Sequence, residues 1–107
     1  MYDEFVAALQ ATEIPFAEYA WDPRPDTNYG VVAPDTAVHF AANGQIRQQA
    51  PQGTVDLFCF SNDRTDMETV QTALNAFEGC AWYLNSVQYE QETRIIHFEW
   101  VFTLETW

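Results

Sequence analysis

The clearest helical pattern in the sequence lies between residues 65 and 77. Large apolar residues recur there at helical spacing and share one face; these are Met67, Val70, Leu74 and Phe77. Thr65 with Glu68 three residues later is typical of a capping box, and Asp63 adds a carboxylate near the positive end of the helix dipole. Gly79 is typical of a residue that ends a helix. The pattern predicts a helix over 65–77 that packs through its apolar face.

A second, shorter helical pattern opens the chain. Phe5, Val6 and Leu9 share one face of a helix over residues 2–12, and Pro15 is expected to stop it. The first turn is acidic, which suits the positive end of the helix dipole. We therefore predict an N-terminal helix.

The remaining patterned segments are predicted to be β-strands, separated by loops and turns. They cover residues 16–21, 29–33, 36–41, 45–48, 54–60, 82–90 and 94–105. Residues 22–28 carry two prolines and form a loop. Asn43-Gly44 is the strongest hairpin signal, because a type I′ turn needs positive φ at both positions. Residues 54–60 are apolar on nearly both faces, which favours a central strand.

The order of these elements defines the expected fold. A helix, several strands, a helix and two strands predict an α+β fold, with a mainly antiparallel sheet and both helices packed on one face. A length of 107 residues with 48% hydrophobic residues favours a single domain over residues 1–107. Eight Phe, five Tyr and four Trp supply a core that needs neither disulfides nor metal.

The charge of the chain restricts its partners. Sixteen Asp and Glu stand against four Arg and no Lys, which gives a net charge of −12. Nucleic-acid and anionic membrane surfaces are bound by clustered basic residues, and the four arginines are scattered along the sequence. Three interpretations of the charge stay open: a solubilising surface, a channel wall that repels DNA, and a mimic of DNA.

Candidate catalytic and metal-binding residues are few. His39 and His97 lie in separate predicted strands, without the spacing of a metal-binding pair. Cys59 and Cys80 sit among apolar or small neighbours, so we expect free, buried thiols in a reducing compartment. No cation close in sequence activates Cys59 as a nucleophile. We predict no catalytic residue, no metal site and no cofactor, and we expect that the chain is not an enzyme.

The N-terminus and the hydropathy of the chain bear on its location. The first residues are acidic, without a basic region followed by an apolar run, and nowhere do about eighteen apolar residues follow one another. We therefore expect a protein made and kept in a cytoplasm, with no membrane partner.

Several large apolar residues at predicted loops and strand ends are candidates for a subunit interface. Side chains of this kind often form contacts between chains when they lack a deep place in a core. The candidates are Trp21, Tyr29, Phe40, Ile46 and Trp82. Ordinary burial is the alternative for each of them.

Three segments resemble the tail completion or tail terminator proteins encoded by prophages of Gram-positive bacteria. Phe40-Ala41-Ala42-Asn43-Gly44-Gln45-Ile46 is similar to the family's Phe-Ala-Ala-(Asp/Asn)-(Gly/Asn)-x-(Val/Ile) hairpin. Residues 55–66 resemble the family's strand and polar loop into a helix, and residues 87–105 its final pair of strands. The resemblance covers nearly the whole chain, which departs from the family at Pro34 and in lacking lysine.

The resemblance implies a structural subunit of a tailed phage or prophage. Such proteins form homo-oligomeric rings, commonly of six subunits, that cap the tail tube and offer a docking surface to the head. The expected partners are tail-tube and head-connector proteins, and DNA would pass through without specific binding. The expected location is the tail end of the virion, after assembly in the host bacterial cytoplasm. A neighbouring head-tail connector protein stays open as an alternative, as does an acidic DNA mimic or inhibitor acting as a monomer or dimer.

Overall fold

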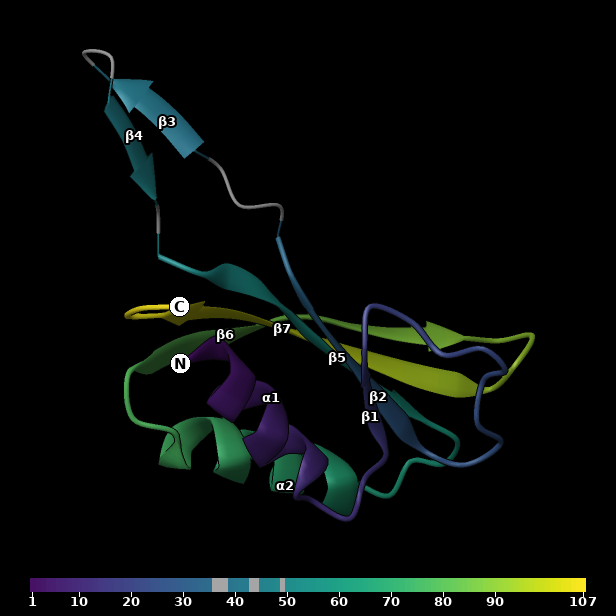
Figure 1. Cartoon of the computed structure of the whole chain (residues 1–107). Helices are drawn as coiled ribbons and strands as arrows, with labels where there is room; N and C mark the ends of the chain where they lie inside the picture. Colours follow the sequence, from purple (N-terminus) through teal and green to yellow (C-terminus); the bar gives the residue numbers. More distant parts are fainter. Residues whose placement is uncertain (36–38, 43–44, 49) are drawn as a thin grey trace.

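The computed structural model describes residues 1–35, 39–42, 45–48 and 50–107, with side chains in residues 1–35 and 50–107. The described chain forms an α+β fold, as predicted (Figure 1). Its elements are α1 (Tyr2–Gln10), β1 (Phe16–Glu18), β2 (Tyr29–Pro34), β3 (His39–Ala42), β4 (Gln45–Gln48), β5 (Gln52–Cys59), α2 (Thr65–Ala76), β6 (Cys80–Glu90) and β7 (Ile95–Leu104).

Five strands form one sheet in the order β1-β2-β5-β7-β6. The pairs β2–β5, β5–β7 and β6–β7 are antiparallel, and only the short β1 pairs in parallel with its neighbour β2. β5 is the middle strand, as its apolar character predicted. β1 and β6 are consequently the two edges of this sheet.

β3 and β4 form a separate antiparallel pair, which lies apart from the five-stranded sheet in Figure 1. Ala42 pairs with Gln45, so the connection between the strands is two residues long, as the predicted hairpin requires. The predicted turn at Asn43-Gly44 itself lies outside the described residues, as do the side chains of 36–49.

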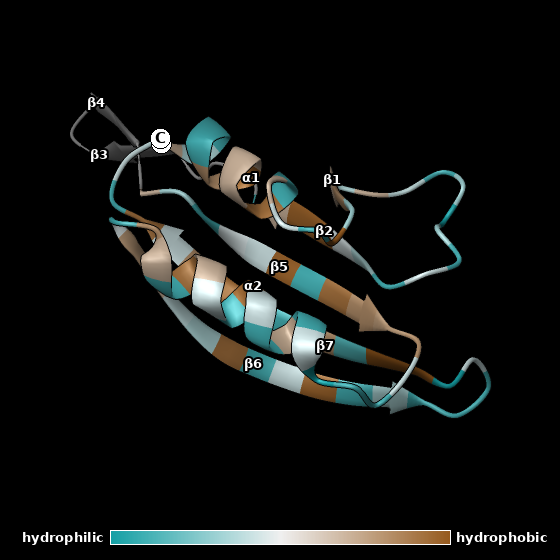
Figure 2. Cartoon of the chain, turned by 90° about the horizontal axis from the view of Figure 1, so that it is seen from below, coloured by the Kyte–Doolittle hydropathy of each residue, from teal (hydrophilic) through white to brown (hydrophobic). Residues whose placement is uncertain are grey.

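Both helices pack on the same face of the five-stranded sheet (Figures 1 and 2). Alternate residues of β5 and β7 point toward them, and most of the buried residues in these two strands lie on that face. The large core side chains that are at most 1% exposed include Phe5, Leu9, Val55, Leu57, Val70, Leu74, Trp100 and Phe102. Burial of each side chain of this size stabilises the fold by about 1.5–3 kcal/mol, so this layer holds the domain together.

The start of α2 is capped differently from the prediction. The Asp63 carboxylate accepts hydrogen bonds from the Thr65 backbone N–H, at 2.9 Å, and from the Thr65 hydroxyl, at 2.7 Å. These bonds lower the pKa of the Asp63 carboxyl, the hydroxyl contact being the larger cause. The predicted capping box of Thr65 with Glu68 is wrong, because the Glu68 backbone N–H donates to the Arg64 carbonyl oxygen at 3.0 Å and not to the Thr65 hydroxyl. The carboxylate expected near this helix end is the capping group.

Both helices end earlier than predicted. The hydroxyl and the backbone N–H of Thr12 both donate to the Leu9 carbonyl oxygen, which tightens the chain and ends α1 at Gln10. After α2, Phe77 is already extended, and Gly79 adopts a φ of +84° in the turn that leads to β6. Gly79 thus serves the turn and is not the residue directly after the helix.

Leu74→Ala is expected to lower the free energy of unfolding by about 2–5 kcal/mol, because Leu74 is fully buried and its truncation leaves a cavity between α2 and the sheet. Urea denaturation measures the difference. Thr72→Ser, which removes a methyl group at an exposed position of the same helix, is the control and is expected to change stability by less than about 0.5 kcal/mol. A Leu74→Ala variant with an unchanged midpoint would show that α2 is not docked as described.

Candidate functional site

The edge strand β6 is the longest strand of the sheet, and its outer side has no partner strand in the described part of the chain. Its large apolar side chains are also open to solvent. Four of them are between 42% and 59% exposed: Tyr83, Leu84, Val87 and Tyr89. A long edge strand with exposed apolar residues offers both backbone hydrogen bonds and apolar surface to another chain.

A bulge in β6 decides which of these side chains point toward the helices. Between Leu84 and Ser86 the register with β7 shifts, and Asn85 is the inserted residue. Leu84 and Val87 therefore pair opposite helix-facing residues of β7, although they are three positions apart. Tyr89, two residues further, faces the same way.

These three side chains line a groove of about 850 Å³ between β6 and the start of α2. Figure 2 shows apolar segments of β6 that α2 does not cover. Met67, Ile96 and Phe98 complete the apolar part of the groove wall, and its polar part is formed by Ser61, Asn62, Asp63, Arg64, Gln71 and Arg94. The groove is thus the uncovered remainder of the face on which the helices pack.

The groove wall carries two arginines and one carboxylate, that of Asp63. Two of the chain's four arginines, Arg64 and Arg94, line it, and neither forms an ion pair within the described residues. A third, Arg24, lies over the ring of Phe60, which also lines the groove, with 5.5 Å between the guanidinium carbon and the ring centroid. Guanidinium groups beside an apolar wall favour a segment that carries carboxylates next to apolar side chains.

The opposite face of the sheet carries a hydrogen-bonded pair, Asp56 of β5 and His97 of β7. His97 Nε2 and Asp56 Oδ1 are 2.6 Å apart. The His97 side chain is 22% exposed and the Asp56 side chain is 16% exposed. The hydrogen bond to Asp56 raises the pKa of His97, while burial acts in the opposite direction. His97 is therefore charged over more of the neutral range than a free histidine, and it offsets a half-buried carboxylate.

His97 also belongs to a stack of three rings across β2, β5 and β7. Tyr29 stacks on Phe58 with centroids 4.7 Å apart, and Phe58 stacks on His97 at 4.3 Å. The strand register places Tyr29 opposite Phe58 and Phe58 opposite His97. In the sequence His97 looks isolated, because its partners are distant along the chain and meet it only through strand pairing.

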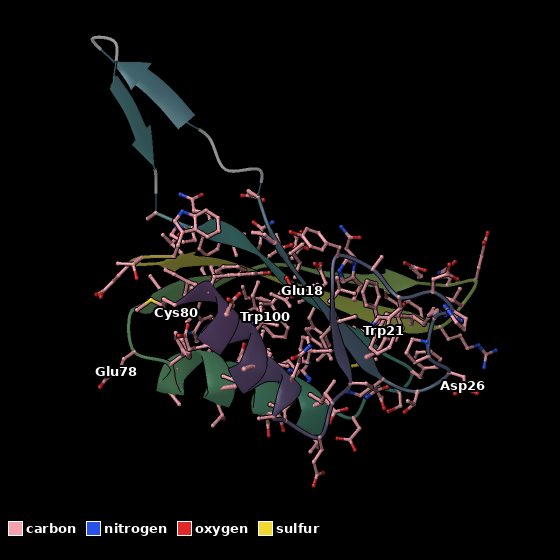
Figure 3. The ribbon with its side chains drawn as sticks, viewed as in Figure 1. Glu18, Trp21, Asp26, Glu78, Cys80 and Trp100 are labelled. Atoms are coloured by element: carbon pink, nitrogen blue, oxygen red, sulfur yellow. The ribbon has the colours of Figure 1, made fainter. Side chains whose placement is uncertain are left out.

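Two of the predicted interface residues, Trp21 and Tyr29, lie together. They line a pocket of about 490 Å³ beside the loop of residues 19–28 (Figure 3 labels Trp21). The Trp21 indole N–H donates to the Gly30 carbonyl oxygen at 2.9 Å, and Tyr29 is only 7% exposed. Both side chains thus make contacts within their own chain.

The other predicted interface residues lie elsewhere. Trp82 is on β6, where it is half-buried and its indole N–H donates to Asn75 Oδ1 at 3.0 Å. Phe40 and Ile46 belong to β3 and β4, and their side chains lie outside the described residues. Of the five, Trp82 is the one placed on the exposed edge strand.

The groove residues were not predicted from the sequence. Leu84, Val87 and Tyr89 break strict alternation because of the bulge, so their shared face is hidden in the sequence. Arg64 and Arg94 are thirty positions apart and look scattered until the fold brings the two segments together at the groove. The signal that could have pointed to the groove was the number of large apolar residues within 82–89.

The cysteines are both free, as predicted, and burial raises the pKa of each to about 11. Cys59 is fully buried, whereas Cys80 is only half-buried, so the expectation of a buried thiol is wrong for Cys80. It lies at the start of the edge strand β6, where one side has no neighbouring strand in the described structure. Thiols with this pKa are protonated at neutral pH.

Metal-binding clusters and membrane-spanning helices are both absent from the described residues. These residues contain no group of three or more His, Cys, Asp or Glu side chains arranged to hold a metal ion. Neither helix in the described part of the chain combines the length and apolar character that a membrane crossing requires.

Comparison of the sequence with protein-family models and with curated protein sequences gave no match.

His97→Gln is expected to lower the free energy of unfolding by about 1–3 kcal/mol near pH 5.5, where protonated His97 donates to the Asp56 carboxylate. Because the folded pKa of His97 lies above its unfolded value, this stabilisation is fully present below the unfolded pKa of about 6.5. It is lost as the pH rises through the folded pKa, so the difference between the two proteins should shrink by pH 9.

Urea denaturation at both pH values measures this difference. Gln88→Ala, opposite His97 in the neighbouring strand, is the control and should give a difference independent of pH. An equal loss for His97→Gln at pH 5.5 and pH 9 would contradict a charged pair.

Proposed function

We propose that the chain is a structural subunit of a tailed phage or prophage, a tail completion or terminator protein that forms a ring at the head-tail end of the tail tube. The observation that carries this proposal is the open, apolar edge strand β6 with its groove. A long exposed edge strand tends to pair with other chains non-specifically unless a specific partner covers it. A ring of identical subunits covers it in every copy.

The two edges of the sheet suit a ring. β1 and β6 lie at opposite ends of the strand order, so each copy can present one edge to each of two neighbours. Such a head-to-tail contact closes into a ring when the rotation from one copy to the next is a whole-number fraction of 360°. The tail tube on one side and the head connector on the other are the further partners of the ring.

The distribution of charge supports a subunit more than a DNA mimic. A mimic of DNA needs its carboxylates on one face. Here Glu4 and Glu68 belong to the helices on one face of the sheet, while Asp56 and Glu99 pair in register on the other. Carboxylates on a channel wall repel phosphates within a Debye length of about 8 Å, so DNA passes without specific binding.

The candidate nucleophile is badly placed for catalysis, which supports a structural role. Cys59 pairs with Ile96 and points into the core under the helices, whereas Phe58 and its partner His97 point to the other face. The thiol and the imidazole therefore lie on opposite sides of the sheet. His97 is already bonded to Asp56, and burial keeps Cys59 protonated.

The protein is expected to sediment as a multiple of its 12.3 kDa subunit, alone or with tail-tube protein, and to appear as closed rings in electron micrographs. Light scattering at several protein and salt concentrations gives the mass. Binding to the end of the tail tube distinguishes a terminator from a neighbouring connector protein.

Val87→Glu places a charge on the exposed edge strand, at a side chain that is 53% exposed, and is expected to release monomers without unfolding the chain. Gln10→Glu, which adds the same charge at an exposed position of α1, should leave the assembly intact. A wild-type protein that stays monomeric even with tail-tube protein would contradict the proposed ring.

A further inference from the structure

We propose that the β3–β4 hairpin of one copy adds to the edge strand β6 of the next copy and extends its sheet. The inference rests on the proposed ring and names the contact by which neighbouring copies join. The contact is head to tail, because the hairpin leaves the sheet between β2 and β5, whereas β6 is an outer edge. Each copy thus gives its hairpin to one neighbour and offers its edge to the other.

The β3–β4 hairpin has strand edges without a partner. Within the described residues, β3 and β4 pair only with each other, and the hairpin lies apart from the five-stranded sheet (Figure 1). The pair that flanks a two-residue turn is hydrogen-bonded, so the next pair, Ala41 and Ile46, directs its backbone N–H and C=O groups outward. A two-stranded hairpin is only marginally stable in water by itself. The hairpin therefore gains stability when it adds to another sheet.

The edge strand β6 can accept such a hairpin through its backbone. The bulge at Asn85 divides β6 into two regular stretches, residues 80–84 and 86–90, and each is long enough to pair with a strand of four residues. Strand addition of this kind takes its affinity from main-chain hydrogen bonds. The contact therefore does not depend on ion pairs with the arginines of the groove.

The distribution of acidic residues favours these two segments as the contact. With a net charge of −12, copies of the chain repel one another, so a contact between them is best made where carboxylates are absent. The two longest stretches of the sequence without Asp or Glu are residues 36–55 and 79–89. The first contains both strands of the hairpin, and the second contains all of β6 except its last residue. Both segments thus combine an unpaired strand edge with the absence of carboxylates.

The strands that meet in this contact carry three of the five predicted interface residues. Phe40 belongs to β3, Ile46 to β4 and Trp82 to β6. These residues were selected as large apolar side chains at predicted loops and strand ends. The proposed contact places all three on strands that join neighbouring copies.

Two double variants test the contact from its two sides. Ala41→Pro with Ile46→Pro removes outward backbone donors of the hairpin, because proline has no N–H group. Tyr83→Lys with Val87→Lys places lysines on the edge strand, at side chains that are 56% and 53% exposed, and lysine on an edge strand opposes pairing. Each double variant alone is expected to be monomeric, and circular dichroism verifies that it is folded.

Each double variant has a matched control. Ala41→Val with Ile46→Val changes the same two positions of the hairpin but keeps their backbone N–H groups. Gln10→Lys with Thr72→Lys adds the same charge at exposed positions of the two helices. Both controls are expected to keep the mass of the wild-type assembly.

An equimolar mixture of the two double variants tests directly whether the hairpin pairs with the edge. The proline variant has an intact β6 and the lysine variant has an intact hairpin, so one contact forms in each pair of molecules. The other hairpin and the other edge of that pair are both altered. The mixture is therefore expected to give a complex of twice the 12.3 kDa subunit mass and nothing larger, which sedimentation over a range of protein concentrations measures.

Hydrogen exchange shows whether β6 is the strand that is covered. Backbone N–H groups of β6 are expected to exchange about tenfold or more slowly in the wild-type assembly than in the proline variant, because strand addition protects them. Equal exchange of β6 in the two proteins overturns the inference.

The outcomes separate this contact from the proposed ring. If either double variant keeps the wild-type mass, the inference is wrong, and the ring stands where the wild type forms one. Two monomeric variants whose mixture gives no complex also overturn the inference. A one-to-one complex in the mixture, together with a wild-type protein that forms open chains, would support the contact and contradict the ring.

Discussion

The structure depends on how much of one sheet face two short helices can bury. α1 and α2, of 9 and 12 residues, pack over the middle of a five-stranded sheet, where Leu74 and Trp100 are fully buried. The Trp100 indole N–H donates to Gln71 Oε1 at 3.2 Å, so even this polar atom is satisfied under the helix. The helices end before the outer part of β6, and the groove is the part of the face that they leave open (Figure 2).

The charge of the chain gives this opening its character. With a net charge of −12, copies of the chain repel one another, which opposes indiscriminate contact between them. The groove departs from that rule, because Arg64 and Arg94 stand beside apolar side chains there. A segment that complements this groove has to supply apolar groups and carboxylates together.

The other face of the sheet is organised by polar and aromatic contacts across strands. Asp56 and His97 neutralise each other, and the stacked rings of Tyr29, Phe58 and His97 tie three strands together without help from a helix. The loop of residues 19–28 covers part of this face through the Trp21 bond to Gly30. One face is thus stabilised by helix packing, the other by side-chain pairs within the sheet.

Local patterns in the sequence determined the α+β class, the helix near residues 65–77 and the central position of β5, because periodicity and strand-long apolar runs depend on neighbouring residues. They did not determine the helix cap, since Thr65 had two possible partners within reach. The open edge, the groove with Arg64 and Arg94, and the stack ending at His97 were decided by the tertiary structure. Each depends on strand order and register, which are set by contacts between residues far apart in the chain.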